Sequence, residues 1–138
     1  MNVTLSSSLT NKSEIFIRPY GQRALYYYEV FEMTVPVNGD YIIHMSNSST
    51  NTCGLLYKEN FYSNSSNVNL FGMNCSISGN LQYHFNYYFK SDTRYILVIT
   101  TLLTQATGNY TLLVSGLNRV NLRKINSSFI VSTTTTTS

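Results

Sequence analysis

The sequence predicts an all-β protein, an antiparallel β-sandwich of the jelly-roll or immunoglobulin-like kind with about seven to eight strands. Three observations predict this fold. Segments that alternate apolar and polar residues recur along the chain, β-branched and aromatic residues dominate these segments, and clusters of Gly, Asn and Ser separate them. No segment has convincing helical spacing. The chain has 138 residues, which is enough for one domain with extensions.

Two strands are expected before residue 36. Residues 14–19 (EIFIRP) alternate and stop at a proline, which cannot donate a ladder hydrogen bond. Residues 26–35 (YYYEVFEMTV) place Phe31, Met33 and Val35 on one face of a strand and polar residues on the other. We expect the apolar face to lie against the core.

A hairpin is expected next, because the Asn-Gly pair in residues 37–40 (VNGD) is the strongest short hairpin turn. The return strand covers residues 40–46 (DYIIHMS). Its alternation turns Tyr41, Ile43 and Met45 toward the core.

Four further strands are expected, at residues 53–58 (CGLLYK), 81–89 (LQYHFNYYF), 94–103 (RYILVITTLL) and 108–116 (GNYTLLVSG). The second and the last of these alternate regularly. Their expected inward residues are Tyr83, Phe85, Tyr87 and Phe89, and Tyr110, Leu112 and Val114.

Two of these strands carry apolar residues on both faces. If Tyr95 and Tyr110 point inward, the alternation turns Ile96, Val98 and Leu113 outward. Exposed apolar strand faces indicate a partner. The alternative is a third layer from this chain, such as its N-terminal segment.

The cysteines of the chain are Cys53 and Cys75. Two cysteines without paired histidines do not make a zinc site. They are either buried free thiols or a disulfide that closes a loop of roughly twenty residues and contributes about 3 kcal/mol. Glycosylation sequons elsewhere favour the disulfide, because both features belong to an oxidising secretory environment.

Seven Asn-x-Ser/Thr sequons occur, at Asn2, Asn11, Asn47, Asn64, Asn74, Asn109 and Asn126. Asn47 and Asn64 lie in Asn- and Ser-rich stretches typical of loops, where a glycan has room. Asn74 and Asn109 lie beside expected strands. The alternative is a set of polar loops without sugar.

The chain ends in a run of threonines. Such a run has no preference for a core and is typical of an extended, polar spacer. Its hydroxyls are candidate O-glycosylation sites at Thr133, Thr134, Thr135, Thr136 and Thr137. The alternative is a disordered terminus.

Charge is scarce in this chain. Asp, Glu, Lys and Arg make up 11% of the residues, which is less than half the usual share. The basic cluster of Arg119, Arg123 and Lys124 indicates a solvated strand edge rather than a nucleic-acid site. No stretch reaches the ~18 apolar residues needed to cross a membrane. We therefore expect neither nucleic acid nor a membrane span.

Signals of enzymatic function are nearly absent. His44 and His84 fall in expected strands, opposite the apolar face. Glu29 and Glu32 fall on opposite faces of one strand, so they cannot form a local acid–base pair. No Gly-x-Ser-x-Gly, P-loop or EF-hand pattern occurs. We expect no catalytic residue, no bound metal and no cofactor beyond covalent glycans.

The order of the expected strands resembles that of a known domain family. The segments FEMTVPVNGDYIIHMS, CGLLYKEN, TRYILVITT and TGNYTLLVSG follow one another. Over about residues 28 to 116, this order resembles the pre-peptidase C-terminal (PPC-like) domain family, with its Val-Pro strand end, Tyr-led strands and final Gly-x-Tyr-Thr-Leu strand.

The resemblance implies a small jelly-roll-like sandwich of extracellular proteins, often repeated in tandem with Ser/Thr-rich spacers and often linked to adhesion or binding. The family commonly has an Asp, sometimes tied to calcium, where Cys53 stands here. The resemblance therefore does not carry calcium binding over to this chain.

These features predict an N-terminal extension or linker strand at residues 1–13, a sandwich domain at 14–117 and a C-terminal extension with a Thr-rich linker at 118–138. We expect a secreted, non-enzymatic structural module of a glycosylated extracellular fibril or surface coat. Its partners would be copies of itself or tandem neighbouring modules. The alternative is a carbohydrate-binding or adhesion module, with aromatic platforms in residues 26–28 (YYY) or 86–89 (NYYF).

Overall fold

The computed structural model describes residues 2–18, 25–63, 65–76 and 80–125, and it confirms the predicted antiparallel β-sandwich. Ten strands form two sheets, one of four strands and one of six. The strands are β1 (Asn2–Leu9), β2 (Glu14–Ile17), β3 (Leu25–Thr34), β4 (Gly39–Ser48), β5 (Thr52–Lys58), β6 (Leu70–Cys75), β7 (Tyr83–Phe89), β8 (Tyr95–Thr101), β9 (Gly108–Gly116) and β10 (Asn121–Ile125).

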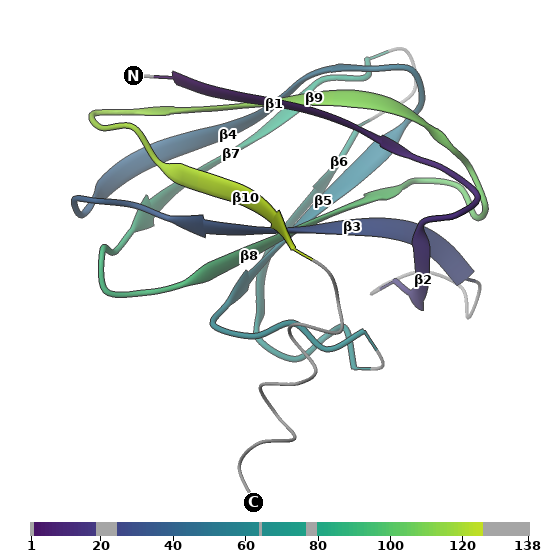
Figure 1. Ribbon diagram of the computed structural model, residues 1–138, viewed down its shortest axis with the longest axis horizontal. Coiled ribbons are helices and arrows are strands. Elements are labelled where there is room, and N and C mark those ends of the chain that lie inside the picture. The colour runs from purple at the N-terminus through teal and green to yellow at the C-terminus, as the bar shows by residue number, and fades with distance from the viewer. Residues whose placement is uncertain (1, 19–24, 64, 77–79, 126–138) are drawn as a thin grey trace, which may run out of the picture.

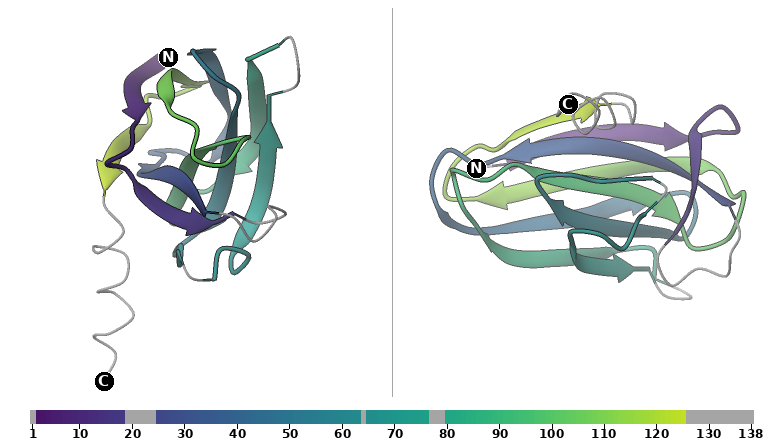
Figure 2. Two further views of the ribbon diagram at one scale, coloured as in Figure 1. Left: turned by 90° about the vertical axis from the view of Figure 1, so that its right-hand side faces the viewer. Right: turned by 90° about the horizontal axis from the view of Figure 1, so that it is seen from below.

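The four-stranded sheet has the order β1-β9-β4-β7, and the six-stranded sheet has the order β10-β3-β8-β5-β6. The short strand β2 pairs with the half of β3 that β10 leaves unpaired. In Figure 1, β1 and β9 cross the top of the molecule while β3 and β8 cross its lower half. Figure 2 gives two further views of the layers.

The core between the sheets is built from alternate residues of the facing strands. Phe31 and Met33 of β3 are fully buried there, and Tyr41, Ile43 and Met45 of β4 face them from the other sheet. The inward faces predicted for these two strands are therefore confirmed. Tyr110, Leu112 and Val114 of β9 join the same core, also as predicted.

A second apolar cluster covers the outer face of the six-stranded sheet. Ile96 and Val98 of β8 are fully buried in it, beneath Phe16 of β2 and Phe61 of the β5–β6 loop. The apolar outer face of β8 is thus covered by residues of the chain itself. The alternative expected from the sequence was a third layer from this chain, but β2 pairs with β3 in the same sheet, so Phe61 of the loop and Phe16 of a neighbouring strand supply the cover. Leu113 of β9 lies outside this cluster and is half-buried.

The hairpin predicted at residues 37–40 is wrong. β3 and β4 belong to opposite sheets, so residues 35–38 cross from one sheet to the other. Neither Asn38 nor Gly39 has the positive φ that a two-residue hairpin requires. Instead, the Asn38 side chain accepts a hydrogen bond from the Ser91 N–H at 2.7 Å, which ties the crossing to the β7–β8 turn.

One close approach between the sheets depends on a glycine. A Cβ at Gly54 of β5 would lie 2.9 Å from the Phe85 ring of β7. The missing side chain lets this ring lie directly over the β5 backbone.

Candidate functional site

The ends of the four-stranded sheet form the candidate functional site, because strands with open backbone edges invite pairing with another chain. We call the outer sides of the two end strands the β1 edge and the β7 edge. In the described part of the chain, β1 pairs only with β9 and β7 only with β4.

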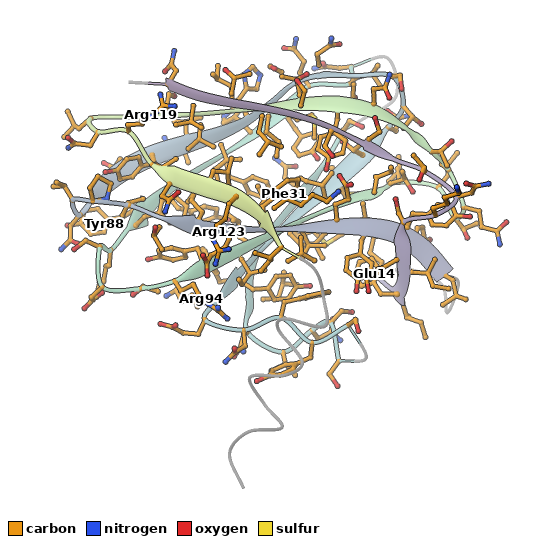
Figure 3. The ribbon with its side chains drawn as sticks, viewed as in Figure 1. Glu14, Phe31, Tyr88, Arg94, Arg119 and Arg123 are labelled. Atoms are coloured by element: carbon orange, nitrogen blue, oxygen red, sulfur yellow. A yellow bond between two sulfur atoms is a disulfide. The ribbon has the colours of Figure 1, made fainter. Side chains whose placement is uncertain are left out.

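The β7 edge directs backbone groups away from β4. The Asn74 side chain of β6 donates to the His84 carbonyl at 3.0 Å, so this carbonyl lies on the outer side of β7. Because alternate residues of an antiparallel strand bond to opposite sides, Asn86 and Tyr88 direct their N–H and C=O groups the same way. Tyr88 is also the most exposed tyrosine ring of this strand, at 59%, and Figure 3 shows it at the periphery.

The β1 edge follows the same alternation. Arg119 donates to the Asn2 carbonyl at 3.3 Å from outside the β1–β9 ladder. The next outward-directed backbone groups along β1 therefore belong to Thr4, Ser6 and Ser8. This leaves a row of hydrogen-bonding groups along most of an eight-residue strand.

The two end strands themselves contain none of the residues that normally prevent strand addition, and the charged side chain at the β1 edge is Arg119, which bonds Asn2 at one end of the strand. β1 (NVTLSSSL) and β7 (YHFNYYF) contain no Lys, Arg, Asp, Glu or Pro. β10 (NLRKI), an end strand of the other sheet, carries Arg123 and Lys124. The basic cluster predicted to mark a solvated strand edge is thus confirmed in position, because both side chains are more than half exposed.

Ion pairs attach β10 to β3. The Arg123 side chain bonds Glu32 at 2.8 Å, and Arg94 bonds the same carboxylate at 3.3 Å. Figure 3 shows Arg94 and Arg123 near β8 and β10. The Lys124 Nζ lies 2.6 Å from the Glu29 carboxylate. This end of the six-stranded sheet therefore has both charge and side-chain cross-links.

Glu29 is a buried carboxylate whose burial and partners were not predicted from the sequence. It is 7% exposed and faces the interior between the sheets. Its Oε1 accepts hydrogen bonds from Ser7 Oγ at 2.7 Å and from the Tyr110 hydroxyl. Burial and the neighbouring Glu29 carboxylate raise the pKa of Tyr110. The sequence did contain a signal for its burial, because Glu29 lies two residues before the inward-facing Phe31 and therefore on the same face of the strand.

A polar pocket of about 530 Å³ opens beside this carboxylate. Ser and Thr hydroxyls of residues 7–13 line it together with Lys12, Glu14 and Lys124. The Glu29 oxygens have three partners, on β1, β9 and β10, so this carboxylate links the two sheets.

The predicted disulfide is present. Cys53 of β5 and Cys75 of β6 are directly opposite each other in the ladder, and their sulfur atoms are bonded. This bond attaches the end strand β6 to the six-stranded sheet. A disulfide is consistent with an oxidising compartment.

The sequons lie on the surface where the structure describes them. The side chains of Asn2, Asn11, Asn47, Asn74 and Asn109 are all exposed. The loop expected around Asn47 is wrong, because β4 extends through Ser48 and has a bulge beside this residue. The Asn64 and Asn126 sequons and the threonine run Thr133 to Thr137 lie outside the described residues.

Two of these asparagines already make side-chain contacts. The Asn109 carboxamide oxygen accepts from Ser8 Oγ at 2.7 Å, and Asn74 bonds both its neighbour and the His84 carbonyl. Glycan occupancy at every sequon stays a prediction.

The expected aromatic platforms are mostly buried. Tyr26 and Tyr28 are buried in one cluster with Phe16 of β2. Tyr27 and Tyr87 are half-buried, and Phe89 is inaccessible. In these two stretches Tyr88 is the aromatic side chain that is largely exposed.

The two histidines lie opposite each other on the outer face of the four-stranded sheet, His44 on β4 and His84 on β7. Among the described residues, no group of three or more His, Cys, Asp or Glu side chains is placed to hold a metal ion. Within the same ranges, no helix has the length and apolarity to span a membrane.

Comparison of the chain with protein-family models, with curated proteins and with solved structures finds no match.

Proposed function

We propose that this chain is a non-enzymatic structural module that joins copies of itself, or tandem neighbouring modules, into a repeating assembly. One observation carries the proposal: both ends of the four-stranded sheet direct backbone hydrogen-bonding groups outward and carry no charged residue or proline. Natural sandwiches protect such edges unless another strand pairs with them.

The strand directions favour head-to-tail joining. Three antiparallel pairings separate β1 from β7, so these two strands run in opposite directions. If a second copy is shifted along the sheet without being turned over, its β1 meets the first copy's β7 in an antiparallel arrangement. Each copy then offers one edge of each kind, which produces an open filament rather than a closed pair.

The setting that we propose is extracellular and secreted. The Cys53–Cys75 disulfide supports an oxidising compartment. Exposed sequon asparagines on both sheets are accessible to N-glycans, which would replace the missing surface charge. The PPC-like resemblance of the sequence points the same way, toward tandem modules of secreted proteins.

We further propose that the module has no hydrolase or transferase activity of its own. The Glu29 carboxylate is occupied by hydroxyl and ammonium partners from three strands, which supports a cross-linking role. The alternative carbohydrate-binding function has less support, because most rings of the two tyrosine-rich stretches are covered.

Substitutions that place a charge on one edge at a time test the proposed head-to-tail pairing of β1 with β7. Thr4→Lys obstructs the β1 edge and Asn86→Lys obstructs the β7 edge, since both side chains are exposed on end strands. By sedimentation velocity across a concentration series, we expect oligomers for the unmodified chain and monomers for each variant alone. An equal mixture of the two variants should form a dimer, because each retains one open edge.

Ile42→Lys is the matched control. It adds the same charge to the same outward face, but on the central strand β4. This variant should still form oligomers. Association of either edge variant by itself, or an unmodified chain that stays monomeric at its highest soluble concentration, would contradict the proposal.

A further inference from the structure

We propose that His44 and His84 form a two-histidine binding site for a divalent late transition-metal ion on the outer face of the four-stranded sheet. The inference concerns these side chains alone and does not depend on the proposed assembly.

The register brings the two imidazoles together. His44 of β4 pairs directly with His84 of β7, and the flanking pairs Ile43–Phe85 and Met45–Tyr83 face the core. Both histidines therefore point to the solvent side from opposite positions on adjacent strands.

The ladder type shortens the distance between them. The His84 carbonyl bonds the Asn74 side chain on the side of β7 away from β4, so His44 and His84 form a non-hydrogen-bonded pair. Directly opposite side chains in such pairs have Cβ atoms about 4.5–5.5 Å apart, which allows two imidazole nitrogens to reach one ion.

The surroundings leave both rings available. They line a surface pocket of about 310 Å³ with Ile42, Leu113 and Ser115. Among the residues that the structure describes, neither imidazole has a hydrogen-bonding or ionic partner. The ring nitrogens can therefore bind an ion without first breaking another contact.

The supporting strands hold the two ligands in place. β4 is a central strand, bonded to β7 on one side and β9 on the other, and His44 is also directly opposite Leu113 of β9. This geometry fixes the backbone of His44 more firmly than a loop would. Two neutral imidazoles suit Cu²⁺, Ni²⁺ and Zn²⁺, with water in the remaining positions, and Cu²⁺ is expected to bind most tightly of these.

Titration with Cu²⁺ alone tests the site, followed by calorimetry and by electron paramagnetic resonance for nitrogen ligation. We expect one saturable Cu²⁺ per chain beyond any bound at the N-terminal amine, with two imidazole nitrogens. Loss of an outer-shell partner already weakens metal sites by about 10–100-fold, so His44→Gln or His84→Gln should weaken this binding by at least that much.

Asn86→Gln is the matched control, because it changes an exposed residue on the same strand and the same face without removing an imidazole. It should leave Cu²⁺ affinity unchanged. Thermal unfolding without metal verifies that each variant folds. Retained affinity in both histidine variants, or spectra with one nitrogen ligand in the unmodified chain, would overturn the proposal.

Discussion

The two sheets of this sandwich differ in how their end strands are secured. In the six-stranded sheet, β10 is tied to its neighbours by the Lys124–Glu29 and Arg123–Glu32 ion pairs, and β6 is attached by the Cys53–Cys75 disulfide. In the four-stranded sheet, β1 and β7 contain no charged residue and no disulfide, and their outward backbone groups are bonded by Arg119 at Asn2 and by Asn74 at His84. This difference supports the proposal that a neighbouring strand pairs with the four-stranded sheet, although β6 (LFGMNC) also contains no charged residue or proline.

Phenol groups connect the two sheets, and alkaline pH should separate them. Tyr83 of β7 bonds Thr52 of β5, and Tyr110 of β9 bonds Glu29 of β3. Burial raises the pKa of both tyrosines, and also that of Tyr57, above the ordinary value. Their folded-state pKa values exceed the unfolded value of about 10, so stability is complete below pH 10 and falls as pH rises above it.

Each such tyrosine costs about 1.4 kcal/mol per pH unit above that point, so the free energy of unfolding should drop by roughly 4 kcal/mol at pH 11. Denaturant unfolding at a series of pH values measures this slope. Tyr83→Phe should remove about a third of it. A free energy of unfolding that stays constant from pH 9 to pH 11 would contradict the buried state of these phenols.

Removing the disulfide should loosen one end of the six-stranded sheet and leave the other intact. Replacing Cys53 and Cys75 together with alanine should lower the free energy of unfolding by about 3 kcal/mol, because the unfolded chain is no longer closed into a loop. Amide exchange should accelerate more in β6 than in β10, because the loss of global stability accelerates exchange throughout the sheet and local opening adds to it at β6. Equal acceleration at both ends would show that the two attachments are not independent.

The buried Glu29 carboxylate should stabilise the fold mainly through its hydrogen bonds with hydroxyl groups, and less through its ion pair with Lys124. Glu29→Leu leaves the Tyr110 and Ser7 hydroxyls without their acceptor, which should cost about 2–3 kcal/mol of unfolding free energy. Glu29→Gln keeps an acceptor oxygen and loses only the pairing with half-exposed Lys124, which should cost below about 1 kcal/mol. Equal losses of unfolding free energy in the two variants would contradict this prediction.

Local alternation was sufficient to predict most strands and their inward faces. Phe31 and Met33 in β3, and Ile43 and Met45 in β4, lie where a period of two places them. The double-sided apolar strand β8 was also recognised. The residues that cover it were not predictable, because Phe16 and Phe61 reach it through tertiary packing and not through sequence spacing.

Sequence reasoning failed where a long-range pairing overrides a local signal. The Asn38-Gly39 pair is a strong hairpin signal, yet β3 pairs with β8 and β4 pairs with β7 and β9. β6 (LFGMNC) was missed because Gly72 interrupts its alternation, and β10 because it is short and basic. Together with β1, which was expected as an extension or linker strand, these two strands account for the difference between the seven strands placed in the sandwich and the ten found.

The candidate site was less predictable than the fold. A lack of charge at strand edges was evident from the composition, but which strands lie at the ends depends on sheet order. The sequence places Glu29 and Glu32 on opposite faces of one strand, but the hydroxyl partners of Glu29 on β1 and β9 lie far away in sequence. The disulfide was favoured over two free thiols because of the sequons elsewhere in the chain, and the structure confirms it.

Electron microscopy of the concentrated protein, at a resolution that separates strands, tests the central claim most directly. The proposed function predicts regularly spaced modules in which β1 of one copy lies antiparallel beside β7 of the next, so that the four-stranded sheets form one continuous sheet. Isolated particles, or modules that touch through the six-stranded sheet while β1 and β7 remain exposed, would contradict it.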